Sequence, residues 1–265
     1  MTQTEIAFPR FPIVSEDVVY QAVFENPIGS SYKASHRVQK FLGNGEPLIW
    51  KQPAIIAGLK NLYYAVQDCG FLRSRTFFAS GKDQLRAEAE KLVHLAEHMP
   101  GLAPKLLHYD PKRGAIVREY IRGETFREMN SQKQEEAIGP IVDLVGRIHK
   151  SGVAIGDAHV KNVIRDDLAG GHKWLDFDGR FDAVPIRAMA DDLLKLAYSS
   201  FTETGDILLA EEMAGELELY PDRDVKKVAA KRVEEMNWTP WLYFATRVSE
   251  TEHKRIKEIL MSSLS

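Results

Sequence analysis

Residues 149–180 decide the fold, and they read HKSGVAIGDAHVKNVIRDDLAGGHKWLDFDGR. The stretch holds two short polar clusters, residues 156–162 and 176–179, each beside apolar residues. A short strand, a tight turn at residues 168–171 and a second strand would carry both clusters to the same end of a hairpin. We therefore expect three of their polar side chains to lie within reach of one another: Asp157, Asn162 and Asp176.

These side chains supply two carboxylates and one amide oxygen. Hard divalent cations prefer such oxygen ligands, and a second carboxylate nearby can accept a proton from a hydroxyl. A metal ion and a proton acceptor placed together are what phosphoryl transfer to a hydroxyl requires. The clusters therefore predict a kinase-type site.

Length and composition exclude several classes of protein. The chain has 265 residues, 44% of them hydrophobic, which is enough for a large core or two lobes and too many for a disordered protein. A net charge of -3 provides no general basic field for nucleic acid. With Cys69 as its one cysteine, the chain has no intrachain disulfide framework. The sequence shows no signal peptide and no apolar run of about 20 residues, so we expect a cytoplasmic protein.

The first half reads mainly as antiparallel sheet. Strand-forming residues at 18–24, 36–42 and 47–51 predict strands, with a hairpin turn at 43–46. Residues 28–33 include small residues and predict a turn, which offers Gly29 and Ser30 as a glycine-poor phosphate loop. A second hairpin is expected from strands at residues 105–109 and 115–121.

A helix is predicted at residues 83–98, because Leu85, Leu92 and Leu95 recur at helical spacing. Glu88 falls on or beside this apolar stripe, where a carboxylate needs a partner. Lys51, on a strand of the preceding sheet, could supply that partner. The alternative for Lys51 is an ordinary exposed strand lysine.

The second half reads mainly as helix. Amphipathic patterns predict a helix at residues 135–150, with Gly139-Pro140 as either a kink or the true start. Four more helices are expected at residues 186–200, 207–219, 225–236 and 248–264. Asp191 and Asp192 are read as opening a helix, where carboxylates complement the helix dipole. We therefore predict two lobes, residues 1–122 and 123–265.

The motifs together resemble the protein-kinase-like superfamily, and most closely the lipopolysaccharide-core (Kdo or heptose) kinases and related small-molecule phosphotransferases. GDAHVKNV resembles their GD-x-H-x-x-N signature, and WLDFD resembles their metal-binding D-F-D or D-F-G. The segments LRAEAEKLVHLAEHMPGLAPKLL and VREYIRGETF are similar to their main helix and their adenine-contacting hinge. The resemblance implies an α+β fold with a small antiparallel-sheet lobe carrying one main helix and a larger helical lobe.

The resemblance also implies a role for each matched residue. Asp157 would be the catalytic base, and Asn162 and Asp176 would hold Mg²⁺. The residues that would bind ATP are Lys51, its ion-pair partner Glu88, Gly29, Ser30, Glu119 and Tyr120. Asp192 resembles the aspartate that supports the catalytic loop, and His159 resembles a buried residue that braces it. The chain departs from the pattern at Ile155, where many relatives have histidine, and at Asp178, where the commoner motif has glycine.

We therefore expect an ATP-dependent kinase that phosphorylates a hydroxyl of a sugar, glycan or other small molecule. The interval after Asp176 contains no serine, threonine or tyrosine up to residue 190, unlike the activation segment of a protein kinase. Arg180 and Arg187 could contact an anionic acceptor. The alternatives are a serine/threonine protein kinase and a catalytically silent pseudokinase scaffold. We expect no nucleic-acid partner and no obligate protein partner, and an aromatic and basic C-terminal region leaves peripheral membrane contact open: Trp238, Trp241, Tyr243 and Phe244.

Overall fold

The computed structural model describes residues 27–32, 36–43, 45–53, 80–178, 185–235 and 248–265. Contacts within the chain divide it into two compact units. Unit 1 is Met1–Ile121 with Asp178–Ala183, and unit 2 is Arg122–Phe177 with Val184–Ser265. The assignment of nucleotide binding to the first half and catalysis to the second stays a prediction. The expected strand at residues 18–24 and the segment at 54–79 lie outside the described residues.

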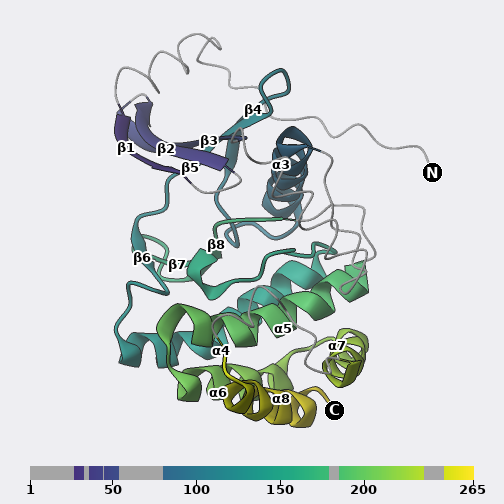
Figure 1. The fold of residues 1–265 in the computed structure, drawn as a ribbon. Coiled ribbons are helices and arrows are strands. Elements are labelled where there is room, and N and C mark those ends of the chain that lie inside the picture. Colours follow the sequence, from purple (N-terminus) through teal and green to yellow (C-terminus); the bar gives the residue numbers. More distant parts are fainter. Residues whose placement is uncertain (1–26, 33–35, 44, 54–79, 179–184, 236–247) are drawn as a thin grey trace, which may run out of the picture. The chain divides into compact units, whose positions relative to one another are not determined.

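Unit 1 contains a five-stranded antiparallel sheet in the order β1-β2-β3-β5-β4 (Figure 1). The prediction of two hairpins is confirmed, because β2 pairs with β3 and β4 pairs with β5. The strands are β1 (Pro27–Tyr32), β2 (His36–Gly43), β3 (Glu46–Pro53), β4 (Leu106–Asp110) and β5 (Ala115–Glu119).

The turn predicted at residues 28–33 is wrong, because this segment forms most of the edge strand β1. Its residues Ser30 and Ser31 pair with Gln39 and Val38 of β2. Small polar residues have weak strand preference, and their conformation depends on the neighbouring strand. Here the long partner β2 supplies the hydrogen bonds that hold them extended.

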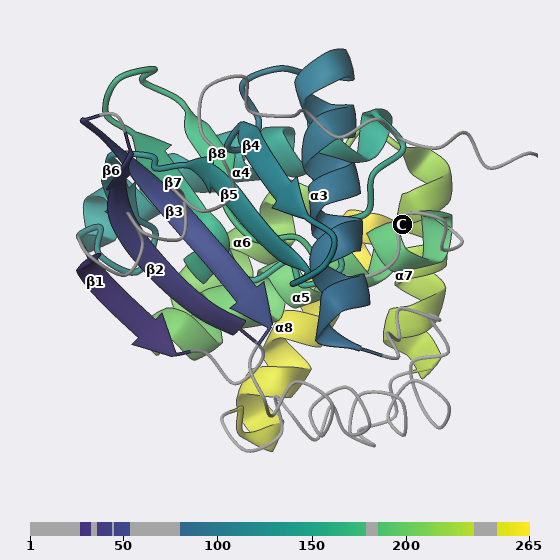
Figure 2. The ribbon, with the colours of Figure 1, turned by 90° about the horizontal axis from the view of Figure 1, so that it is seen from above.

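The core of unit 1 lies on both faces of the sheet. Phe41, Trp50, Ala115 and Val117 form a buried cluster. Helix α3 (Gly81–His98) packs against β3, β4 and β5, as the view from above shows (Figure 2). Its predicted leucine stripe is confirmed, since Leu85, Leu92 and Leu95 are all fully buried. The helix begins after Ser80, whose side chain accepts a hydrogen bond from Asp83 N.

Unit 2 combines a three-stranded sheet with a helical layer (Figure 1). The sheet has the order β6-β7-β8, formed by β6 (Gly123–Thr125), β7 (Val163–Asp166) and β8 (His172–Trp174). Helix α5 packs against both α6 and α7, and α8 packs against the same two helices. The helical elements are α4 (Ser131–Lys150), η2 (Val160–Asn162), α5 (Pro185–Thr204), α6 (Ile207–Glu216), η3 (Leu217–Leu219), α7 (Arg223–Glu235) and α8 (Glu250–Leu264).

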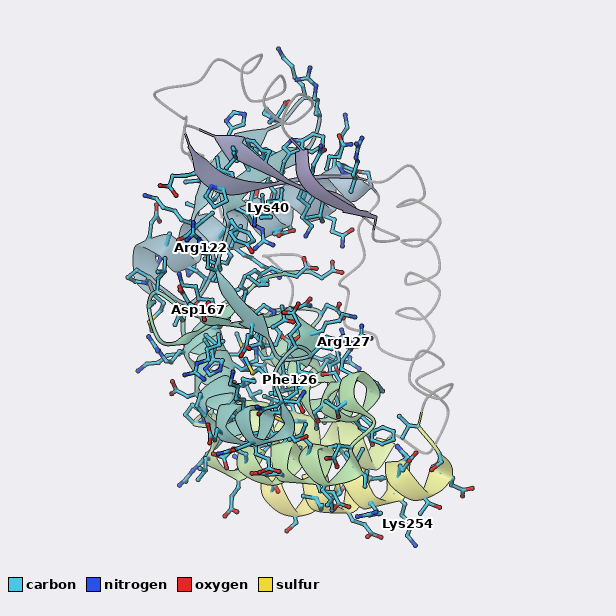
Figure 3. The ribbon with its side chains drawn as sticks, turned by 90° about the vertical axis from the view of Figure 1, so that its left-hand side faces the viewer. Lys40, Arg122, Phe126, Arg127, Asp167 and Lys254 are labelled. Carbon is cyan, nitrogen blue, oxygen red and sulfur yellow. The ribbon has the colours of Figure 1, made fainter. Side chains whose placement is uncertain are left out.

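Strand β6 joins the hairpin through a close backbone contact. A Cβ atom at Gly123 would lie 1.7 Å from the carbonyl oxygen of Arg165, so only glycine permits this approach. Next to this strand, Phe126 is fully buried and its N–H donates to Val163 O at 3.0 Å. Asp167 N donates to Arg122 O at 3.0 Å, and these two residues lie near each other in Figure 3. The hairpin is therefore fixed to the chain that enters unit 2.

Helix α4 begins earlier than predicted. It starts at Ser131 instead of residue 135, because the Asn130 side chain accepts a hydrogen bond from Lys133 N at 2.9 Å and caps it. Pro140 therefore lies inside the helix and does not start it. Among the described residues, no helix is long and apolar enough to cross a membrane.

The β7–β8 turn yields a first prediction. Asp166 accepts hydrogen bonds from Leu168 N and Ala169 N and pairs with Lys173 at 2.8 Å. Burial would raise the pKa of Asp166, but Lys173 and the two backbone donors lower it below its ordinary value of 3.8. Asp166→Asn should therefore cost about 1–2 kcal/mol of unfolding free energy at pH 7. A carboxyl group whose pKa is lowered by folding loses its contribution to folding stability as the pH falls through that lowered pKa.

Urea denaturation at several pH values checks this. The difference between Asp166→Asn and wild type should shrink as the pH falls below 3.8, while the exposed neighbour variant Asp167→Asn should change little throughout. An equal loss of unfolding free energy at neutral and acid pH would show that the charge of Asp166 contributes nothing to stability.

Candidate active site

The loop that carries Asp157 is supported from below by Asp192. This carboxylate is fully buried and accepts hydrogen bonds from Ile155 N at 2.7 Å and Gly156 N at 2.9 Å. It also lies 3.2 Å from His149 Nε2, whose Nδ1 contacts the Tyr220 hydroxyl at 2.7 Å. The predicted support of the loop by Asp192 is confirmed.

The expectation that Asp191 and Asp192 open a helix is wrong. Helix α5 begins at Pro185, so both residues lie in its second and third turns. Specific partners, and not the helix dipole, compensate for the burial of these carboxylates. Asp191 pairs with Arg232 of α7, and Asp192 accepts hydrogen bonds from the loop that carries Asp157. The fully buried Ile155 provides the apolar contact expected where relatives have histidine.

Removing the Asp192 carboxylate should destabilise unit 2. Asp192→Ala would leave two buried backbone N–H groups unsatisfied, at a cost of about 2–3 kcal/mol in unfolding free energy. Urea denaturation measures the loss, with Asp143→Ala on the exposed face of α4 as the matched control. A loss below about 0.5 kcal/mol, the usual range for surface substitutions, would contradict the supporting role.

Asp157 sits on this loop immediately after a glycine in the left-handed region. Gly156 has φ of +88°, which glycine adopts without the strain that a side chain would add. The Asp157 side chain is 38% exposed, and its Oδ1 lies 3.5 Å from Nε2 of the buried His159. The structure thus presents this carboxylate to solvent while bracing it from one side, in keeping with the bracing role expected for His159.

Positive groups surround Asp157. Burial would raise the pKa of its carboxyl group, but His159, Lys195 and Lys161 together lower it, against a smaller raising effect of Asp176. Lys195 is fixed in place by donating to Gly156 O at 2.5 Å. Glu203 lies 3.8 Å from His159 and 3.6 Å from Lys161, which anchors both of these side chains. Asp157 is therefore held ionised and able to accept a proton.

The hairpin brings Asn162 and Asp176 to the same loop, as predicted. Val163 pairs with Trp174, so Asn162 precedes β7 and Asp176 follows β8 at the same end of the hairpin. Leu175 N donates to Asn162 O at 2.7 Å, and the indole of Trp174 donates to Asp176 O at 2.9 Å. The three polar side chains of the prediction are thereby gathered in unit 2.

These residues fit a magnesium ion. Asn162 is buried, and its Nδ2 donates to Asp157 O at 3.3 Å, which orients the amide so that its oxygen faces away from that bond. Asp176 adds a half-buried carboxylate. Among the described residues, no three His, Cys, Asp or Glu side chains gather to form a metal site of their own. Mg²⁺ commonly uses one or two protein ligands and completes its shell with water and phosphate oxygens.

Within unit 1, Lys51 and Glu88 form the predicted ion pair. Lys51 Nζ lies 2.5 Å from Glu88 Oε2, and their side chains are 2% and 0% exposed. The exposed strand lysine considered as the alternative is therefore excluded. The register of β3 explains why Lys51 is buried. Lys51 pairs with Ile116 on β5, and its side chain reaches the face of the sheet that α3 covers.

The other predicted nucleotide-binding residues also belong to unit 1. Glu119 ends β5, where its N–H donates to Lys105 O at 3.0 Å and its carboxylate accepts from Lys105 N at 3.1 Å. Tyr120 follows, with Lys40 Nζ 3.6 Å from its ring centre. Gly29 and Ser30 lie on the edge strand β1, separated from β3 by β2. Their binding roles stay predictions.

Sequence reasoning missed several residues around these groups. Lys195 and Glu203 come from α5, and Gln84 and Lys91 of α3 contact Asp178. Each joins a partner more than 30 positions away in the chain, and no local pattern encodes such a pairing. Arg180 and the aromatic cluster at residues 238–244 lie outside the described residues.

Two comparisons with known proteins match, and no protein-family model does. A solved structure of WaaP in complex with acyl carrier protein aligns over 91% of this chain and 92% of its own, with a TM-score of 0.50 and 14% identity. A probable bifunctional tRNA threonylcarbamoyladenosine biosynthesis protein of Methanothermobacter thermautotrophicus is 34% identical over 116 residues. That match covers 43% of this chain and 20% of the relative, so the chain spans about a fifth of its length.

The chain has a protein-kinase-like fold. Its α+β architecture, with an antiparallel sheet and one main helix in the first half and a helical second half, agrees with the resemblance seen in the sequence. One solved structure that it resembles is that of WaaP.

Proposed function

We propose that the protein is an ATP-dependent phosphotransferase acting on a hydroxyl of a sugar, a glycan or another small molecule. The observation that carries this proposal is the gathering of Asp157, Asn162 and Asp176 at one end of the β7–β8 hairpin. A partly exposed carboxylate beside two oxygen ligands provides a proton acceptor next to a magnesium-binding pair. A pseudokinase scaffold would be expected to lack one of these groups.

Each residue has one task in the proposed reaction. Asp157 orients the acceptor hydroxyl and takes its proton late, as the hydroxyl oxygen bonds to the γ-phosphorus and the bond to ADP breaks. Asn162 and Asp176 hold magnesium, which when bound neutralises charge on the phosphates. Lys51, oriented by Glu88, binds phosphate oxygens. Positioning and charge stabilisation supply most of the rate.

The proposed acceptor class rests on the short interval that follows Asp176. Helix α5 begins at Pro185, within one residue of its predicted start, so only a short interval separates Asp176 from the next helix. Residues 177–184 contain no serine, threonine or tyrosine that could be phosphorylated. A compact hydroxyl compound needs a pocket near Asp157 but no long peptide platform. Arg187, half-buried on α5, is a candidate contact for an anionic group of the acceptor.

The relatives guide the choice of conditions more than the choice of acceptor. The WaaP structure contains acyl carrier protein, so assays should be run with and without a carrier protein, although we expected no obligate protein partner. The relative named for tRNA threonylcarbamoyladenosine biosynthesis matches over too little of its length to support an acceptor of its own.

An acceptor screen tests the proposal. Purified protein is incubated with Mg²⁺ and ATP labelled on the γ-phosphate, together with sugars, sugar acids, glycan cores or generic protein substrates. We expect label to enter a saccharide or other small hydroxyl compound. Efficient labelling of proteins, with every small molecule inert, would favour the serine/threonine kinase alternative. Nucleotide binding without any transfer would favour the pseudokinase.

A further inference from the structure

One face of α3 carries three buried polar side chains. Gln84, Glu88 and Lys91 follow one another at spacings of four and three residues, which places them on the same side of the helix. They are 5%, 1% and 1% exposed. Burying polar and charged groups is costly unless each has a partner. Glu88 pairs with Lys51, and the other two side chains point to a further contact.

Asp178 provides that contact. Gln84 Nε2 donates to Asp178 Oδ1 at 2.9 Å, and Lys91 Nζ donates to the main-chain carbonyl of Asp178. Both the side chain and the backbone of Asp178 therefore bind α3, across separations of 94 and 87 residues.

Asp178 stands where the commoner motif has glycine, and glycine has no side chain for Gln84 to bind. The motif is also where the chain crosses between units, since Phe177 belongs to unit 2 and Asp178 to unit 1. Within unit 2, Trp174 holds the carbonyl of Asp176, and Phe177 is 1% exposed. The segment 176–178 is therefore fixed at each of its three residues.

We propose that Asp178 is a positioning residue, which fastens the segment carrying Asp176 to α3 through Gln84 and Lys91. The same helix holds Glu88, the partner of Lys51. Asp178 follows the candidate metal ligand by two residues and is bound, within unit 1, to the helix that orients the candidate phosphate-binding lysine. The consequence for nucleotide binding rests on the proposed function, whereas the fastening itself does not.

Hydrogen–deuterium exchange of the full-length protein tests the fastening. Asp178→Ala should speed exchange in peptides spanning residues 172–180 about tenfold or more, because losing a partly buried hydrogen bond to a charged group raises local opening by that factor. Gln84→Met should act in the same direction, and the double variant should add little to the stronger single one. Asp178→Asn, which keeps an acceptor oxygen, should recover most of the protection. Glu90→Gln, on the same helix but paired with Arg86, is the control.

The outcomes separate the two proposals. Unchanged exchange in a folded Asp178→Ala protein would overturn the fastening, whether or not the protein transfers phosphate. If Asp178→Ala does not fold, Gln84→Met removes one bond alone, and unchanged exchange in that variant is equally decisive. Where wild type binds Mg²⁺–ATP, Asp178→Ala should weaken the affinity about tenfold. Faster exchange in a protein that binds no nucleotide would leave the fastening standing and refute the proposed function.

Discussion

Replacing Asp157 with asparagine should lower turnover about a hundredfold or more while leaving nucleotide affinity nearly unchanged. Asparagine has almost the same shape but cannot accept the proton of the acceptor hydroxyl, and a positioned proton acceptor typically contributes that much to the rate. The surrounding contacts predict a folded variant, because the loop is held by backbone hydrogen bonds to Asp192. Initial rates and equilibrium binding of ATP, measured on the same preparation, separate the two effects.

The Asp157→Asn test has a matched control and an outcome that would contradict it. Asp143→Asn, an exposed aspartate on α4 with a side chain that is 69% exposed, should have wild-type turnover. If Asp157→Asn turns over its substrate at the wild-type rate, the assignment of Asp157 as the proton acceptor is wrong.

Breaking the buried Lys51–Glu88 ion pair of unit 1 should have the largest effect on the free energy of unfolding. Lys51→Met would leave the Glu88 carboxylate buried at 0% exposure without its cation, and removing one partner of a buried pair costs about 3–5 kcal/mol. Glu88→Leu should cost a similar amount for the same reason. Replacing both together removes both buried charges, and such double substitutions are often nearly neutral.

The double variant distinguishes a structural pair from a nucleotide-binding one. Lys51→Met with Glu88→Leu should recover most of the unfolding free energy but should still bind Mg²⁺–ATP far more weakly than wild type. Urea denaturation and calorimetric titration give the two quantities, and Lys105→Met, at an exposed lysine, is the control. Full recovery of nucleotide affinity in the double variant would show that Lys51 does not bind phosphate.

Local sequence patterns predicted the elements that carry the candidate site. The leucine spacing identified α3, and turn residues between short apolar runs identified the β7–β8 hairpin. That hairpin was enough to bring Asn162 and Asp176 together. The same local reasoning missed the start of α4, which Asn130 caps so that the helix begins four residues before its predicted start. It placed the start of α5 within one residue of Pro185.

Contacts between segments that are distant in the sequence were harder to predict than the helices and strands. The α3 position of Glu88 suggested a partner, because a buried carboxylate is unusual, and this led to Lys51. Nothing comparable marked Gln84, Lys91 or Lys195, whose side chains read as ordinary surface groups on amphipathic helices. Their partners are main-chain atoms or a carboxylate 39 to 94 residues away, and only the folded chain brings these together.

A crystal structure with Mg²⁺ and a non-hydrolysable ATP analogue would test the central claim most directly. We expect a metal ion bound by Asp176 and the amide oxygen of Asn162 at about 2.0–2.1 Å, with Lys51 on the phosphates and the Asp157 carboxylate facing the γ-phosphate. A nucleotide bound with its metal on other residues, or crystals without nucleotide at saturating concentration, would contradict it.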